Sequence, residues 1–414
     1  MPIVFGCAED HEPEATSVAD GTDGSTGERG DTANTDDTTA GELDTTGGST
    51  SDPGSDESSG GEPIPIVEAE QRWRVEGPYG SATAVCVRPD GSVMLATSRT
   101  NGDYDRRSDL AAFTADGDAL WTTAIDEPPA GTYFHAVACA PDGAVYAVGQ
   151  RGEYDSESIP LLIRVEFEGT TSWTVTLPGV TQAGFFGGAI ADAEGVFVVG
   201  ARDAAPEDFG HSPLLARYEQ DGTESWMAND RLGGDDGAFH DVVRVGDVLM
   251  AVGNTSGEDY DEHAVVASFE QGGAYRWHTE IAEGWSVALH VAVDPSSDAA
   301  FVAGTYGRSF SQTDAWSMRC DVDGCIDPEL FAEFDVSFGT FDGFAIDALG
   351  RRIGANRGRT EARARDGAVA WTFDAEAQFV WTQLRSTVAI DPSGTIYTAV
   401  GQDPAVLIAL TPPQ

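Results

Sequence analysis

The chain has 414 residues and a formal net charge of −47, because 70 Asp and Glu residues face only 23 basic residues. Such an acidic surface argues against a nucleic-acid partner, since binding a phosphate backbone requires a basic footprint. The 5 Cys are too few for a disulfide scaffold and match no CxxC zinc spacing. No apolar run reaches the ~18 residues of a membrane-spanning helix.

The N-terminal part of the sequence divides into two short regions before the repeats begin. Residues 8–65 are rich in Asp, Glu, Ser, Thr and Gly, and they carry too little apolar surface to offset an ordering cost of roughly 1–2 kcal/mol per residue. We therefore predict a disordered acidic tether. Residues 1–7 end in IVFGC and resemble the end of a bacterial lipoprotein signal, with Cys7 as the lipidated residue. This resemblance implies a cell-envelope protein that is lipid-anchored to a bacterial membrane and exposed to the periplasm or the exterior.

Residues 66–414 carry a repeated pair in which a Gly stands four residues before a Trp. A Gly in a tight turn supplies a positive φ between two strands, so the Trp falls at a fixed place on the second strand. Successive pairs are about 50 residues apart, which is a propeller-blade period. The pairs are Gly117 with Trp121, Gly169 with Trp173, Gly222 with Trp226, Gly273 with Trp277 and Gly367 with Trp371.

A second pattern precedes each Gly–Trp pair. A short apolar run ends in a turn, as in AVCVRPDG and AVACAPDG, and a β-rich run such as AVYAVG or GVFVVG follows. Together the two patterns predict an all-β fold, a seven-bladed β-propeller of four-stranded antiparallel blades over residues 66–414. The seven first strands are expected near Val85, Val137, Ile190, Val242, Val291, Ile346 and Val388.

The two ends of the repeat region complement each other. The last unit stops after its third strand, whereas EQRWRVEG around Trp73 is a Trp strand with no strands before it. We predict that this N-terminal strand completes the C-terminal blade by pairing with the strand of Val406, Ile408 and Leu410, which leaves no exposed edge. An open β-solenoid is the alternative.

The fifth unit departs from the pattern, because Pro328 stands four residues after Gly324, where a Trp is expected. Cys320 and Cys325 flank this turn, and we predict a cross-strand disulfide between them in an oxidising compartment.

The repeats resemble the PQQ-like, or quinoprotein-like, β-propeller family, whose blades carry a Gly and a Trp on the outer hairpin. In its catalytic members this resemblance would imply a quinone cofactor. The chain has neither an adjacent Cys pair nor a matched carboxylate and calcium set for that cofactor. It is closer to the non-catalytic members, including scaffold lipoproteins, so no cofactor is expected.

Aromatic and His side chains precede or begin most of the first strands, on the face where propellers usually bind ligands. Two interpretations are open: packing between blades, or an aromatic cup for a sugar or a peptide. Aligned on the turns that follow, His135 is shifted by one residue relative to His240 and His290, which disfavours a metal site. The candidate ligand-binding residues are Tyr79, Tyr133, His135, Phe186, Phe239, His240, Trp285, His290 and Trp381.

The loops between second and third strands are acidic, as in GDYD and GEDYDE. Clustered carboxylates can bind Ca²⁺, and a solvated acidic rim is the alternative interpretation. The candidate calcium ligands are Asp103, Asp105, Asp259 and Asp261.

No GxSxG, GKS or GKT phosphate loop, HExxH or partnered Cys nucleophile occurs in the sequence. We therefore predict a monomeric, non-catalytic cell-envelope propeller that binds a protein or glycan ligand. The alternative is a propeller enzyme, either a glycan hydrolase or lyase or a quinoprotein-like oxidoreductase.

Overall fold

The computed structural model describes the chain from residue 66 to residue 413, with gaps. None of these residues is helical, so no helix that could cross a membrane occurs among them. The described ranges are 66–101, 105–125, 131–152, 158–177, 184–205, 208–228, 236–256, 262–281, 285–309, 312–326, 329–330, 342–356, 358–375, 388–401 and 404–413.

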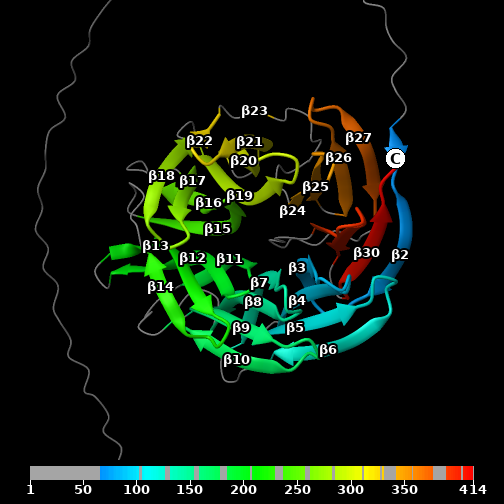
Figure 1. Ribbon diagram of the computed structural model, residues 1–414, viewed down its shortest axis with the longest axis horizontal. Helices are drawn as coiled ribbons and strands as arrows, with labels where there is room; N and C mark the ends of the chain where they lie inside the picture. The colour runs from blue at the N-terminus through cyan, green and yellow to red at the C-terminus, as the bar shows by residue number, and fades with distance from the viewer. Residues whose placement is uncertain are drawn as a thin grey trace, which may run out of the picture. The chain divides into compact units, whose positions relative to one another are not determined.

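The strands form seven sheets, antiparallel except where β1 joins blade 6, and these sheets are the blades of a β-propeller (Figure 1). Blade 1 contains β3 (Ser81–Val87), β4 (Val93–Asn101), β5 (Asp105–Phe113) and β6 (Ala119–Ile125). Blade 2 contains β7 (Thr132–Cys139), β8 (Val145–Arg151), β9 (Ile159–Val165) and β10 (Thr171–Thr176). Blade 3 contains β11 (Phe185–Ala191), β12 (Gly195–Ala205), β13 (Asp208–Glu219) and β14 (Glu224–Ala228). Blade 4 contains β15 (Asp236–Val245), β16 (Val248–Ser256), β17 (Glu262–Glu270) and β18 (Tyr275–Ile281).

The remaining three blades complete the ring. Blade 5 contains β19 (Trp285–Asp294), β20 (Ala299–Ser309), β21 (Gln312–Asp321), β22 (Gly324–Cys325) and β23 (Glu329–Leu330). Blade 6 contains β24 (Gly343–Ile346), β25 (Arg352–Asn356), β26 (Arg359–Arg363), β27 (Val369–Asp374) and the N-terminal β1 (Val67–Glu68). Blade 7 contains β28 (Val388–Ile390), β29 (Ile396–Val400), β30 (Val406–Thr411) and β2 (Glu70–Glu76). The first strand of each blade lies at the centre, and apolar side chains between neighbouring blades form the core.

The predicted closure of the ring is confirmed. Strand β2 pairs antiparallel with β30, so that Trp73 lies opposite Ala409 and Arg74 lies opposite Ile408. The N-terminal segment also adds a strand to blade 6, because β1 pairs in parallel with β27, with Val67 opposite Trp371. The N-terminal strands therefore close one blade and extend its neighbour.

Tryptophans of the outer strands join five of the blades, blades 7, 1, 2, 3 and 4, to the next blade around the ring. The ring of Trp121, from blade 1, covers Gly169 of blade 2, where an added Cβ would come within 2.6 Å of it. Its indole Nε1–H donates to the carbonyl oxygen of Phe167 at 2.9 Å. The same donation recurs from Trp73 to Ala115, Trp173 to Gln220 and Trp277 to Val322, and Trp226 likewise covers Gly273.

The boundary between blades 5 and 6 lacks this contact among the described residues. The tight turn at Val322 and Asp323 makes this hairpin shorter than expected. The N–H of Ile326 therefore donates to the carbonyl oxygen of Arg319, so Ile326, and not Pro328, takes the strand position that a Trp occupies in the other blades. No described atom lies within 4 Å of a Cβ built on Gly367. An ion pair from Arg365 of blade 6 to Asp294 of blade 5, at 3.0 Å, links the two blades instead.

Two disulfides are present among the described residues. Cys320 and Cys325 are joined across the blade 5 hairpin. The second disulfide, which the sequence did not lead us to expect, joins Cys86 of β3 to Cys139 of β7. It covalently links the first strands of blades 1 and 2.

A glycine substitution pair isolates the tryptophan contact. Gly169 and Gly367 occupy the same turn position with φ near +88 and +86, but only Gly169 lies under a Trp ring among the described residues. Both Gly169→Ala and Gly367→Ala incur backbone strain of roughly 1–2 kcal/mol. We expect Gly169→Ala to lose about 1–3 kcal/mol more, because its methyl group overpacks Trp121. Guanidinium unfolding of both variants measures the difference, and equal losses would contradict the role of the contact.

Candidate functional site

A row of four rings crosses the first strands of blades 2, 3 and 4. Tyr133 and His135 have ring centroids 5.1 Å apart, and His135 lies 5.3 Å from Phe185. Phe185 in turn stacks on His240 at 6.2 Å with an interplanar angle of 12°. Tyr133, His135 and Phe185 are half-buried. The row therefore brings together ring faces from three blades, two of which contribute an imidazole.

Neighbouring groups hold both ends of this ring row. The guanidinium of the buried Arg106, from β5 of blade 1, lies 5.3 Å from the centre of the Tyr133 ring. His240 Nε2 lies 2.8 Å from the amide oxygen of Asn254 on β16, which orients the imidazole. The row is thus built on strands and supported by side chains from the strands behind it.

A β-bulge recurs in the first strands of blades 1 to 5 and sets which side chains lie in the row. Pairing skips one residue in each strand, and the bulged residues are Thr83, His135, Gly187, His240 and Leu289. The extra residue reverses the side-chain alternation along the rest of the strand. In blades 2 to 5 a Gly stands opposite the bulge, and a Cβ on Gly149 or Gly200 would lie 1.9 Å from a carbonyl oxygen of the first strand.

This bulge corrects our alignment of the histidines. His135 and His240 occupy the same bulged position, and His290 is the one that differs, because it follows the bulged Leu289 and pairs with Ala303. His290 is only 2% exposed. No group of three or more His, Cys, Asp or Glu side chains suited to a metal occurs among the described residues.

Two of the predicted binding residues belong to the core instead. Phe186 is fully buried and packs edge-on against Tyr218, and Phe239 is 2% exposed against Phe269. The burial of both fits packing between blades rather than the aromatic cup, and in blade 3 the strand turns Phe185, not Phe186, toward the row. The adjacent FF pair in the sequence carries this ambiguity, and only the register of the strand resolves it.

The other predicted residues lie apart from the row. Tyr79 is 65% exposed in the connection between β2 and β3, outside the row. Trp285 lies at the start of β19, next to Glu262 of blade 4, and burial raises the pKa of the Glu262 carboxyl. Trp381 and the lipidation residue Cys7 lie outside the described residues.

The predicted calcium ligands are not described either. Asp103, Asp259 and Asp261 fall in gaps, and although Asp105 begins β5, its side chain is not described. The calcium site stays a prediction.

Asp241 follows His240 and ties blade 4 to blade 5. Its carboxylate accepts the backbone N–H of Val242 at 2.8 Å and that of Val291, on β19, at 3.0 Å. Burial raises the pKa of Asp241 above its ordinary value, against the opposing effect of these two donors. Because part of the residue stays accessible, solvent screening reduces the shift without reversing it.

Comparison with known proteins identifies the class by its fold. No protein-family model and no curated protein matches the chain. It is similar to the Pan2 WD40 domain from Neurospora crassa, at 10% identity and a TM-score of 0.56, over 85% of this chain and 98% of that one. At this identity the likeness shows the fold alone, a β-propeller, and the PQQ-like resemblance stays a prediction.

Two further solved structures are similar at lower TM-scores. One is the β-propeller domain of the Trilobed protease from Pyrococcus furiosus, at 9% identity and a TM-score of 0.48, over 80% of this chain and 96% of that one. The other is a gluconolactonase from Xanthomonas campestris, at 13% identity and a TM-score of 0.43, over 82% of this chain and 100% of that one.

The position of Asp241 predicts an unusual dependence of stability on pH. A raised folded-state pKa means that the folded protein binds the proton more tightly than the unfolded chain. The stabilising effect of this proton is present below about pH 4, near the ordinary pKa of Asp, and is lost as the pH rises toward neutrality. As the pH rises through that interval, the free energy of unfolding of the wild type in urea should therefore fall relative to that of Asp241→Asn.

Asp192→Asn is the matched control, because the pKa of Asp192 is shifted in the opposite direction. Burial opposes ionisation of Asp192, but two hydrogen bonds from Arg217, at 2.9 and 3.1 Å, outweigh it and lower the pKa. Its contribution is present at neutral pH and is lost as the pH falls. Parallel curves for wild type and Asp241→Asn would refute the assignment.

Proposed function

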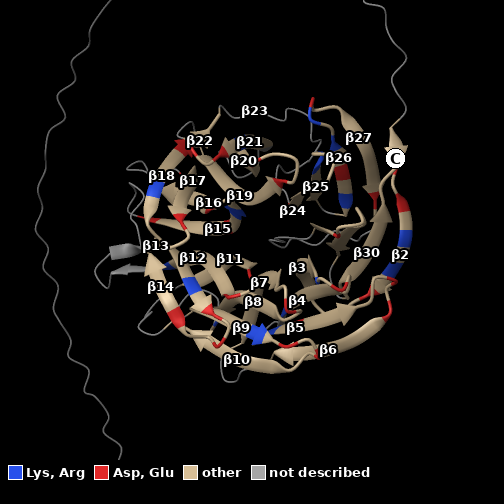
Figure 2. Cartoon of the chain, viewed as in Figure 1, with Lys and Arg blue, Asp and Glu red and all other residues tan. Residues whose placement is uncertain are grey.

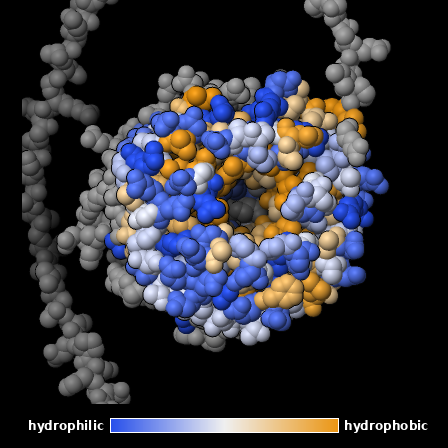
Figure 3. Space-filling view, in the orientation of Figure 1, coloured by the Kyte–Doolittle hydropathy of each residue, from blue (hydrophilic) through white to orange (hydrophobic). Residues whose placement is uncertain are grey.

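We propose that the chain is a non-catalytic cell-envelope propeller that binds a glycan or protein ligand at the ring row on blades 2 to 4. The observation that carries the proposal is the row itself, Tyr133, His135, Phe185 and His240, in which three blades contribute stacked or tilted rings. Half-buried aromatic ring faces are typical of the lining of small-ligand sites. Figure 3 shows that the ring is hollowed at its centre, with apolar residues beside the opening.

The chemistry of the row favours a glycan. Aromatic faces stack on the apolar faces of sugar rings, and the imidazoles can exchange hydrogen bonds with hydroxyl groups. Arg106, stacked over Tyr133, adds a positive charge within an acidic protein.

The envelope location in this proposal has separate support. Disulfides persist mainly in oxidising compartments, and the described residues contain two of them. The lipid anchor at Cys7 remains part of the proposal and rests on the sequence alone.

A glycan array and a peptide library, screened with the full chain, test the binding function. We expect a glycan ligand whose affinity falls about 10-fold in Phe185→Ala and in Tyr133→Ala, equivalent to ~1.4 kcal/mol. Tyr275→Ala is the matched control, because Tyr275 is a 43% exposed aromatic residue on the outer strand β18. It should leave the affinity unchanged.

Three results would contradict the proposal. These are the absence of any ligand, a ligand whose affinity is indifferent to both ring substitutions, and catalytic turnover of a bound glycan, which would favour the propeller enzyme.

A further inference from the structure

The turn between β26 and β27 of blade 6 has the same form as the turns that receive a tryptophan in other blades. The N–H of Ala364 donates to the carbonyl oxygen of Ala368, and that of Gly367 donates to the carbonyl oxygen of Ala364. The blade 1 turn, which receives Trp73, has the same two bonds, and its Gly117 has a φ of +91 against +86 for Gly367. The backbone of the blade 6 turn is therefore already shaped to receive an indole ring.

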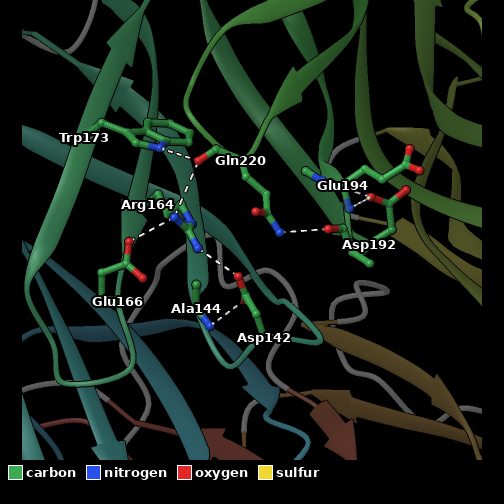
Figure 4. A network of polar contacts seen from close by, with 10 residues as sticks. Asp142, Ala144, Arg164, Glu166, Trp173, Asp192, Glu194 and Gln220 are labelled. Atoms are coloured by element: carbon green, nitrogen blue, oxygen red, sulfur yellow. Dashed lines mark hydrogen bonds and ion pairs between the residues drawn. The ribbon is translucent and has the colours of Figure 1, made fainter.

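The blade 6 turn also presents the carbonyl oxygen that accepts an indole N–H at other boundaries. Figure 4 shows this contact between blades 2 and 3, where Trp173 Nε1–H donates to the carbonyl oxygen of Gln220 at 2.8 Å. Gln220 stands two residues before Gly222, the turn glycine that the Trp173 ring covers. Arg365 stands two residues before Gly367 in the same way. No described group donates a hydrogen bond to the Arg365 carbonyl oxygen.

Ile326 of blade 5 stands where a tryptophan faces the turn at the other boundaries. It lies opposite Arg319, as Trp277 lies opposite Ser268 in blade 4. The Ile326 side chain does not cover the turn, because none of its atoms comes within 4 Å of a Cβ built on Gly367. It is itself 56% exposed. We refer to this uncovered surface as the open turn, which consists of Arg319, Ile326, Arg365 and Gly367.

Arg319 places a positive charge in the open turn. The equivalent residue of blade 4, Ser268, is fully buried beside its tryptophan, whereas Arg319 is exposed. In blade 2 the equivalent Arg164 is paired with Asp142 and Glu166, at 2.8 and 2.9 Å (Figure 4). No carboxylate among the described residues pairs with Arg319. Figure 2 shows further basic residues on β25 and β26 of blade 6, across the same boundary.

An indole with a carboxylate beside it matches every feature of the open turn. The ring would cover Gly367, its N–H would reach the Arg365 carbonyl oxygen, and the carboxylate would meet Arg319. We propose that the open turn docks a partner protein through an exposed tryptophan that is flanked by an acidic residue. The chain itself shows how such a ring is held, because equivalent turns hold those of Trp73, Trp121, Trp173, Trp226 and Trp277. The proposal is independent of the ring row, which lies on the first strands at the centre of the propeller.

Short labelled peptides added to the full chain test this docking by fluorescence anisotropy. The first probe has a central Asp-Trp-Asp segment. In two matched peptides the Trp is replaced by Ala or by benzothienylalanine, which has the shape of Trp but lacks its N–H. We expect the Trp peptide to bind at least about 10-fold more tightly than the Ala peptide. It should bind about 5-fold more tightly than the benzothienylalanine peptide, which loses one hydrogen bond.

A peptide with a central Ser-Trp-Ser segment tests the acidic flank. Wild type should prefer Asp-Trp-Asp by about 3-fold, and Arg319→Ala should lose this preference. Because the chain carries a net charge of −47, a preference for Asp reports a local positive charge. A preference that is unchanged in Arg319→Ala would contradict the proposal.

Ile326→Trp supplies the missing ring from the chain itself. The new indole should cover Gly367 and weaken binding of the Asp-Trp-Asp peptide at least about 10-fold. Leu120→Trp is the matched control, because Leu120 is 47% exposed on the outer strand β6 of blade 1. It adds the same side chain away from the open turn and should change the affinity less than about 2-fold.

A pair of glycine variants keeps the test valid if Ile326→Trp fails to fold. Gly367 and Gly394 have φ of +86 and +90, and no described atom lies within 4 Å of a Cβ built on either. Both Ala variants therefore carry the same backbone strain, but only Gly367→Ala places a methyl group where the partner's ring would lie. We expect it alone to weaken binding, by about 10-fold. Equal binding of the Trp and Ala peptides, unchanged affinity in Ile326→Trp, or equal effects of the two glycine variants would overturn the proposal.

Discussion

The packing of a tryptophan on the glycine turn of the next blade is the contact on which the ring depends. It combines burial of a large ring, an Nε1–H donated to a turn carbonyl, and a glycine that leaves room for the indole. The contact recurs across the closure, where Trp73 donates to Ala115 at 2.8 Å. The N-terminal strand thus completes blade 7 and also joins it to blade 1, so the ring is closed where the two ends of the propeller chain meet.

Because contacts between the outer strands hold the blades together, the side chains of the first strands at the centre can differ from blade to blade. The same strands present aromatic and imidazole rings at their beginnings and apolar side chains at their ends. The bulge between these halves changes the alternation, so one strand can carry two chemically different surfaces. The disulfide between Cys86 and Cys139 fastens two of these strands where the outer contacts do not reach.

The sequence predicted the features that repeat and missed those that depend on register. The fold could be predicted from the Gly–Trp pairs, the seven units and the unpaired Trp73 strand, because turns and burial leave local patterns in a sequence. A β-bulge leaves no such pattern, so Phe186 was chosen where Phe185 lies in the row. The link from Cys86 to Cys139 had a signal, since both stand near the ends of equivalent first strands, but it requires knowing that those strands are neighbours in space.

Hydrogen exchange tests the closure of the ring most directly. Trp73→Ala removes one ring from one strand, yet our account ties that ring to two blades. We expect faster amide exchange both in Val406–Thr411, the partner strand within blade 7, and in the blade 1 turn at residues 114–117, which receives the indole. Trp173→Ala should leave both segments unchanged. Faster exchange confined to Val406–Thr411, with the blade 1 turn unaffected, would contradict the account.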